Sequence, residues 1–251
     1  MSQDKQSYSA AIIIIGNEIL SGRTVDKNTN WLALRLVDLG IKLAEVRVIP
    51  DIRQKIIDTI HELRDGVDYI FTTGGIGPTH DDITAESVAG AFGVDVVQDE
   101  RAYKLLLDHY GAEAELTPAR LKMAMLPEGA DIIDNPVSGA PGFKIGNVYV
   151  MAGVPRIMQG MFDHIAPSLT GGPPVASVTV ECALPESVIA DDLNALQDQY
   201  PQVDMGSYPN YQHGVFSTSL VLRCSDEDLL AKAAEAVRAM VARHNERNVT
   251  Y

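Results

Sequence analysis

A glycine-rich turn that joins a buried strand to a helix is the feature that most constrains how this chain can fold. β-Branched and aromatic residues dominate Val67–Phe71, which predicts a buried strand, and Ile83–Phe92 has the pattern of a helix. The stretch between them, Thr72–Asp82, reads TTGGIGPTHDD. A strand that turns sharply into a helix at such a cluster is typical of an α/β fold.

A phosphate is the ligand that this turn suits best. Glycines carry no side chain, so backbone N–H groups can approach an anion, and the start of the following helix adds a partial positive charge. Threonine hydroxyls add further donors. The residues predicted to contact a phosphate-containing small molecule are Thr72, Thr73, Gly74, Gly75, Ile76, Gly77, Pro78 and Thr79. The glycines can equally form a tight turn alone, with Thr79 or Asp82 as a helix N-cap.

Two aspartates follow the turn directly. Asp81 and Asp82 would repel a bare phosphate, so carboxylates at this position indicate a bridging divalent ion such as Mg²⁺, Mn²⁺ or Co²⁺. We predict both as catalytic residues and metal ligands. Glu18, which follows the apolar run Ala10–Gly16, is a third candidate metal ligand, or else a solvated loop acid. His80 is either a general base or an ordinary loop residue.

Two other loops of small and rigid residues follow predicted strands. Asn135–Phe143 and Ala152–Pro155 could let the backbone approach a ligand, although the first can equally be the approach to a hairpin. Three such loops around one edge of a sheet provide what a nucleotide-sized pocket needs. The ligand-binding residues predicted in these two loops are Gly139, Ala140, Pro141, Gly142, Gly153 and Pro155.

The apolar pattern divides the chain into two domains. Ala10–Gly16 is apolar without alternation, as in a parallel strand that is covered on both faces. Thr170–Pro174 is rich in glycine and proline and predicts a linker. A β-α-β-β-α pattern then predicts a small α+β domain at 175–251, in which nothing demands chemistry. Its polar stretch Pro209–Gly214 predicts a turn, with His213 exposed.

Local signals also predict where several helices begin. Asn28 or Thr29 is expected to cap one helix, and Asp51 the next, because their side-chain oxygens can accept from free first-turn amides. Thr117–Pro118 predicts a cap and a first-turn proline before a helix at 119–125.

The charge of the chain restricts its partners. The formal net charge is -14, which disfavours binding to nucleic acid or to an anionic membrane, because both would be repelled. No stretch reaches the roughly 18 apolar residues that a membrane span needs. Cys182 and Cys224 are too few for a disulfide scaffold, so reduced thiols in a cytoplasmic protein are expected.

Several ordered motifs together resemble the amino-terminal part of the competence/damage-inducible protein A (CinA) family. They are GNEILSG at 16–22, Asn28, Trp31–Leu32, TTGGIGPTHDDIT at 72–84, NPVSGAPGF at 135–143, and Gly153–Pro155. The resemblance covers roughly residues 9–169. It implies a three-layer α/β sandwich of the molybdopterin-binding MoaB/Mog type with a mostly parallel sheet, followed by a small α+β domain. The amidohydrolase domain of full-length relatives is expected to be absent.

The same resemblance implies a function. The phosphate of a pterin or nucleotide would lie on the loop 73–79, and the activity attributed to such domains is metal-dependent cleavage of a pyrophosphate, with ADP-ribose or FAD as substrates. Asp82, Thr84 and Glu86 match an Asp-x-Thr-x-Glu pattern of MoaB/Mog-like domains, and Asn28 is carried over as a ligand-binding residue. Asn17 departs from the aspartate of many relatives. Relatives commonly assemble, so a homo-oligomer is expected.

Two other functions fit the same residues. The chain could be a non-catalytic binder of molybdopterin or of a nucleotide, related to molybdenum cofactor biosynthesis. It could also be a structural partner protein whose pocket is vestigial. Binding without turnover would indicate the first of these, and failure of every such ligand to shift the melting temperature would indicate the second.

Overall fold

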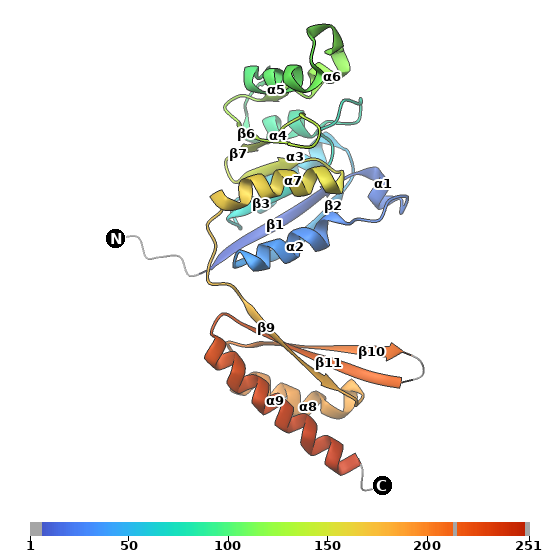
Figure 1. Cartoon of the computed structure of the whole chain (residues 1–251), viewed down its shortest axis with the longest axis vertical. Coiled ribbons are helices and arrows are strands. Elements are labelled where there is room, and N and C mark those ends of the chain that lie inside the picture. Colours follow the sequence, from blue (N-terminus) through green and yellow to red (C-terminus); the bar gives the residue numbers. More distant parts are fainter. Residues whose placement is uncertain (1–6, 213–214, 249–251) are drawn as a thin grey trace, which may run out of the picture. The chain divides into compact units, whose positions relative to one another are not determined.

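Residues 1–172 and 173–251 form two separate units in the computed structural model of the chain (Figure 1). The structure describes residues 7–212 and 215–248. The division falls inside the predicted linker Thr170–Pro174. Within the described residues, none of the helices combines the length and the apolar character that a bilayer span requires.

A six-stranded sheet forms the centre of the first unit, in the order β2-β1-β3-β8-β7-β6. Its strands are β1 (Tyr8–Ile15), β2 (Ile41–Ile49), β3 (Tyr69–Thr73), β6 (Asp131–Ile133), β7 (Gly142–Ile145) and β8 (Val148–Met151). The first four strands in that order run parallel, and β7 and β6 continue the sheet antiparallel. The prediction of a mostly parallel sheet is confirmed.

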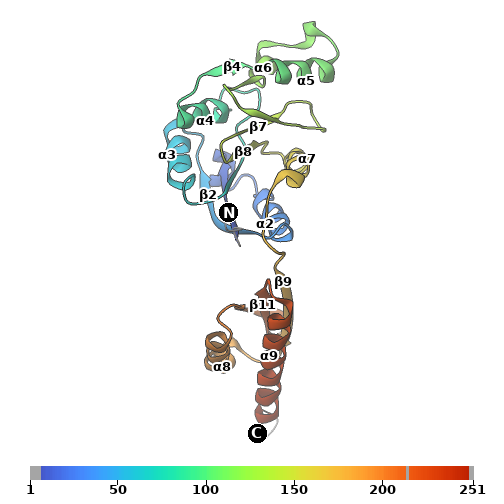
Figure 2. The same ribbon diagram turned by 90° about the vertical axis from the view of Figure 1, so that its left-hand side faces the viewer.

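Helices cover both faces of this sheet, so the unit has three layers. Figure 2 shows α3 (Arg53–Leu63) and α4 (Thr84–Phe92) on one face and α2 (Asn28–Asp38) and α7 (Pro155–Ile165) on the other. Alternate residues of β1 enter different cores: Ile13 and Ile15 pack on the first side, and Ile12 and Ile14 on the second. This explains why the strand sequence is apolar without alternation.

A helical segment extends from the sheet between α4 and β6. It consists of β4 (Val96–Gln98), α5 (Glu100–Tyr110), the 3-10 turn η1 (Glu113–Glu115), α6 (Pro118–Lys122) and β5 (Met125–Pro127). The predicted helix at 119–125 is too long, because Met125 pairs with Gln98 in a small antiparallel ribbon. Thr117 caps α6 through the amide of Arg120, as predicted.

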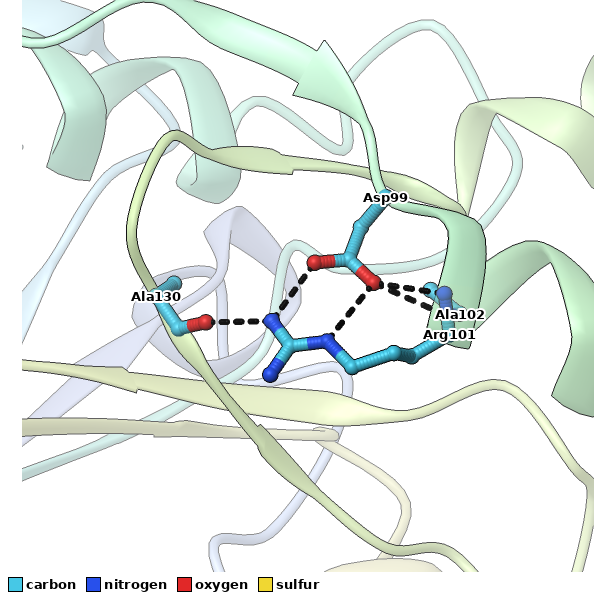
Figure 3. A network of polar contacts seen from close by, with 4 residues as sticks. All are labelled: Asp99, Arg101, Ala102 and Ala130. Carbon is cyan, nitrogen blue, oxygen red and sulfur yellow. Dashed lines mark hydrogen bonds and ion pairs between the residues drawn. The ribbon is translucent and has the colours of Figure 1, made fainter.

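Asp99 anchors the start of α5 (Figure 3). Its carboxylate accepts from the amides of Arg101 and Ala102 at 2.8 and 3.1 Å and pairs with the Arg101 guanidinium at 2.7 Å. That guanidinium also donates to the carbonyl of Ala130 at 2.7 Å, which ties α5 to the segment before β6. The hydrogen bond from Arg101 holds the pKa of Asp99 below its ordinary value.

Two predicted helix caps are wrong. The cap of α2 is supplied by Asp26, whose carboxylate accepts from the amides of Asn28 and Thr29 at 2.8 and 3.2 Å. Asp51 does not cap α3, because its carboxylate accepts from the amide of Asn17 at 2.8 Å instead. That contact fixes the beginning of the one-turn helix α1 (Asn17–Leu20), in a stretch that reads as a loop.

The second unit has the predicted β-α-β-β-α order. Its elements are β9 (Ala176–Cys182), α8 (Glu186–Gln199), β10 (Asp204–Gln212), β11 (Val215–Cys224) and α9 (Glu227–Asn248). The antiparallel sheet β10-β11-β9 shares one apolar core with both helices, and Cys182 and Cys224 are free and buried in it. The turn predicted at Pro209–Gly214 begins too early, because β10 continues to Gln212. His213 lies outside the described residues.

Candidate functional site

Three loops at the carboxyl ends of parallel strands surround one cleft in the first unit. Gly16 follows β1, Gly74 follows β3 and Ala152 follows β8, and parallel strands end at the same edge of their sheet. The cleft has a volume of about 610 Å³. Its lining residues come from five segments and are Glu18, Thr24, Gly74–Pro78, Asp82, Tyr110, Met123, Asn135, Ser138, Ala140, Ala152–Pro155 and Ile157.

The glycine turn is packed tightly between β1 and α4. A Cβ atom on Gly74 would lie 2.2 Å from the carbonyl oxygen of Ile15, and one on Gly75 would lie 2.2 Å from Thr84 Oγ1. Both glycines have a positive φ, of +104° and +69°. Thr84 donates its amide to the carbonyl of Gly75 and its hydroxyl to that of Gly74, both at 3.0 Å. These two glycines are therefore required by packing alone.

The amides of the turn nevertheless remain available to a ligand. Within the described residues, the N–H groups of Gly75, Ile76 and Gly77 donate to no protein acceptor, whereas that of Gly74 donates to the carbonyl of Met151 at 3.1 Å. All of Gly74–Pro78 lines the cleft. Consecutive free amides on a turn form a concave anion site.

Thr79 joins the two aspartates. Its hydroxyl lies 2.6 Å from Asp81 Oδ1 and 2.5 Å from Asp82 Oδ2, and its amide donates to the same Asp82 oxygen at 2.8 Å. The hydrogen bond from Thr79 is the main cause of a lowered pKa at Asp81, and His80 and Lys122 add smaller electrostatic effects. Neither Thr79 nor Asp82 caps α4 with its side chain, so that alternative is wrong.

The groups at the cleft that can attract an anion are backbone dipoles, because no cationic side chain is among the described residues that line it. Of the described residues that line it, the charged ones are Glu18 and Asp82, which are both acidic. The helices α4 and α7 begin beside the cleft, at Thr84 and Pro155, and the N-terminus of a helix carries a partial positive charge.

Asn28 and Thr73 lie beside the cleft, and Thr72 is buried in β3. Asn28 is 4% exposed and donates from Nδ2 to the carbonyl of Gly153 at 2.8 Å. Together with Thr73 it lines a smaller pocket of about 60 Å³, which shares Glu18 and Pro155 with the cleft. The oxygens Asn28 Oδ1, Thr72 Oγ1 and Thr73 Oγ1 are buried and have no hydrogen-bond partner in the described part of the chain.

The loop before β7 contributes less than its glycines suggest. Ala140 lines the cleft, and Asn135 Nδ2 donates to its carbonyl at 2.7 Å. Gly139 packs against the His109 side chain, and Gly142 against the carbonyl of Val150. Pro141 lines a separate pocket of about 30 Å³ behind the glycine turn. Of the four predicted residues in this loop, the structure therefore places Ala140 at the cleft.

The acidic residues do not form a closed metal cage. Among the described residues, no three or more histidine, cysteine, aspartate or glutamate side chains are arranged to hold a metal ion. The Glu18 carboxylate folds back over Gly16, 2.5 Å from where a Cβ would stand. The pair Asp81–Asp82 still fits Mg²⁺, because such an ion is commonly held by one or two carboxylates together with substrate phosphates.

Several lining residues lay outside the predicted site residues, among them Tyr110 and Met123. Tyr110 ends α5 and Met123 follows α6, so both come from the helical segment between α4 and β6. An amphipathic helix pattern predicts only that such side chains turn inward. The packing of this segment against the glycine turn is what brings them to the ligand side.

Comparisons with known proteins agree with this fold. A family model described as "Probable molybdopterin binding domain" matches residues 11–171, and one described as "FAD synthase, middle domain" matches residues 174–249. A protein of Pyrobaculum calidifontis is 37% identical over 212 residues, which cover 80% of each chain. A CinA-like protein of Anaeromyxobacter dehalogenans is 36% identical over 186 residues, which cover 70% of this chain and 45% of that protein.

A solved structure extends the likeness to three dimensions. The protein CinA from Thermoplasma acidophilum, whose function is given as unknown, superposes with a TM-score of 0.61 at 34% identity, over 65% of this chain and 99% of that one. The first family model covers the sheet except for the first three residues of β1, and it covers all three loops around the cleft. The chain therefore belongs to the family of probable molybdopterin-binding domain proteins and is CinA-like.

Proposed function

We propose that this chain is a metal-dependent pyrophosphatase that hydrolyses an ADP-ribose-like or FAD-like nucleotide. One observation carries the proposal: Gly75–Gly77 line the cleft with amides that have no acceptor among the described residues, and Thr79 in the same turn holds the carboxylates of Asp81 and Asp82. Anion-binding amides beside an acidic pair are what hydrolysis of a phosphoanhydride requires.

The size and surroundings of the cleft support a dinucleotide-like substrate. A volume of about 610 Å³ lies within the range of small-molecule and cofactor sites. The match of residues 174–249 to the middle domain of FAD synthase supports a flavin or adenine nucleotide as ligand. The family description supports a pterin in the same cleft.

Each group of residues has a distinct task in this reaction. The amides of Gly75–Gly77 and the starts of α4 and α7 would bind one phosphate of the substrate. Asp81 and Asp82 would hold the divalent ion, and Glu18 stays a candidate for the same task. Such an ion, when bound, would supply Lewis-acid polarisation of a phosphoryl oxygen and would orient a water.

The bond changes are those of a hydrolysis. The oxygen of a water forms a bond to one phosphorus while the bond from that phosphorus to the bridging oxygen breaks. The bridging oxygen leaves on the other phosphate, and the attacking water gives up its protons. ADP-ribose and water would therefore yield AMP and ribose 5-phosphate.

The test measures AMP release. The protein is incubated with ADP-ribose or FAD in the presence of Mg²⁺, Mn²⁺ or Co²⁺, and AMP is quantified by chromatography. We expect the wild type to release AMP, and the rate of release to fall by at least about 100-fold in Asp82→Asn. The control Asp108→Asn, which changes an exposed acid on α5, should release AMP at the wild-type rate. If neither the wild type nor Asp82→Asn releases AMP with any of these metals, the protein is not this enzyme.

A non-catalytic binder of molybdopterin or of a nucleotide is the second candidate. The description of the matching family favours it, and so does the lack of a closed metal cage among the described residues. Isothermal calorimetry that gives tight binding of a pterin or nucleotide, in a protein that releases no AMP, would decide for this function.

A further inference from the structure

Lys122 stands out because it lines a pocket that shares the glycine turn and Asp82 with the otherwise acidic cleft. The large cleft is lined by the acids Glu18 and Asp82, in a chain with a formal net charge of -14. The small pocket of about 30 Å³ behind the glycine turn is lined by Asp82, Glu86 and Lys122, and there Lys122 is the one cationic side chain among the described residues.

The Lys122 ammonium reaches the turn from a distant part of the sequence. Its Nζ donates to the carbonyl oxygen of Thr79, a residue 43 positions earlier. The hydroxyl of Thr79 lies within hydrogen-bond distance of both Asp81 and Asp82, and the Thr79 amide donates to Asp82. Thr79 therefore accepts a hydrogen bond from the ammonium with its carbonyl oxygen, and its hydroxyl and amide contact the two carboxylates.

The helix that carries Lys122 is itself fixed in place. Thr117 caps α6, and Pro118 occupies its first turn. The guanidinium of Arg120 lies 4.0 Å from the centre of the Tyr110 ring and donates to the carbonyl of Glu115 at 2.5 Å. Because the helix is fixed and the Lys122 side chain is half-buried, the ammonium can adopt few positions.

We propose that Lys122 is a positioning residue, which fixes the turn at Thr79 so that Asp81 and Asp82 can hold a divalent ion together. This inference rests on the proposed function. Two adjacent carboxylates repel each other, and an ammonium that holds the Thr79 backbone helps to keep both side chains in one geometry. Outer contacts that orient metal-ligating carboxylates affect metal affinity as well as activity.

The experiment compares three variants of the full chain. Lys122→Met removes the ammonium, Lys122→Arg keeps a donor and a charge, and Lys104→Met removes an exposed lysine from α5 as the matched control. Mn²⁺ binding is measured by electron paramagnetic resonance without any substrate. The kcat and KM for AMP release from ADP-ribose are measured in parallel, and thermal melting checks the fold.

We expect Lys122→Met to weaken Mn²⁺ binding by about 10- to 100-fold and to lower kcat by a similar factor with little change in KM. Lys122→Arg should recover most of both, and Lys104→Met should match the wild type. Unchanged Mn²⁺ affinity in Lys122→Met overturns the inference, and so does an equal loss in Lys104→Met.

The proposed function can fail separately. If the wild type binds Mn²⁺ but releases no AMP, the pyrophosphatase proposal is wrong, while the Mn²⁺ affinities of the variants still decide the role of Lys122. If the wild type releases AMP but binds no Mn²⁺ without substrate, the inference about Lys122 is wrong while the proposed function stands.

Discussion

The side-chain amide of Asn28 donates to the backbone carbonyl of Gly153 at 2.8 Å, across 125 positions of the sequence. This hydrogen bond joins the first residue of α2 to the loop between β8 and α7. Because both segments border the ligand side of the sheet, it holds two walls of the site at a fixed distance.

Loss of that hydrogen bond should be measurable. Asn28→Ala removes this hydrogen bond to the exposed residue Gly153, and we expect the free energy of unfolding of the first unit to fall by about 0.5–1.5 kcal/mol. Asn30→Ala, an exposed position on the same helix, is the control and should change little. Urea unfolding followed by circular dichroism gives both values, and equal stability of the two variants would contradict the prediction.

Gly75→Ala should destabilise the glycine turn by more than the cost of placing alanine at a positive φ. Gly75 and Gly93 have nearly the same φ, +69° and +67°, but a Cβ meets Thr84 Oγ1 at 2.2 Å only at Gly75 and has open space at Gly93. We expect Gly93→Ala to cost about 1–2 kcal/mol, and Gly75→Ala to cost more and to abolish ligand binding. Calorimetric melting and ADP-ribose titration test this. A Gly75→Ala protein as stable as Gly93→Ala would show that the turn can relax.

Thr73→Val should stabilise the unliganded protein. The Thr73 hydroxyl is buried without a partner in the described residues, so valine of similar shape removes an uncompensated polar group worth about 1–3 kcal/mol. Thr218→Val is the contrasting case, because its buried hydroxyl donates to the carbonyl of Leu184 at 2.9 Å, and this variant should be less stable. Opposite shifts in melting temperature are expected. If Thr73 is a ligand donor as the sequence predicts, the same change also weakens nucleotide binding.

The Asp99–Arg101 pair should make stability depend on acid pH. The pKa of Asp99 is lowered in the folded chain by the hydrogen bond from Arg101. The contribution of this pair to folding stability is therefore fully present above the ordinary aspartate pKa of about 3.9. It is lost as the pH falls through the lower pKa that Asp99 has in the folded chain.

Asp99→Asn keeps a capping side chain and removes the charge, so a loss below about 1 kcal/mol is expected at pH 7, because Arg101 is largely exposed. The difference from the wild type should be smaller at about pH 3 than at pH 7, because the pair contributes less once the pH falls below the ordinary aspartate pKa. Unfolding curves at both pH values measure it, and a difference that is equal at pH 7 and pH 3 would argue against the ion pair.

Much of the architecture follows from local pattern. The unalternating run at Ala10–Gly16 predicts a strand buried on both faces, and β1 has that environment. The sequence also predicts where a ligand site can lie. Glycines follow β3 and precede a helix pattern, and small-residue loops follow other strands; parallel strands bring such loops to one edge of the sheet.

Contacts between distant segments could not be predicted in the same way. Asp51 and Asn28 both resemble helix caps, yet one binds the amide of Asn17 and the other the carbonyl of Gly153, because those groups become neighbours only when the sheet has formed. Gly139 and Gly142 resemble ligand-loop glycines but are required by the packing of His109 and of the Val150 carbonyl.

The sequence by itself determined the strand buried on both faces and the glycine turn with its two aspartates, since period, propensity and turn chemistry act over a few residues. The three-layer sandwich was implied by the resemblance to a known family. The tertiary structure alone decided which polar groups meet at that turn. Lys122 reaches Thr79, and Tyr110 reaches the cleft, because a hydrogen bond or a packing contact depends on distance in space, which the order of residues does not specify.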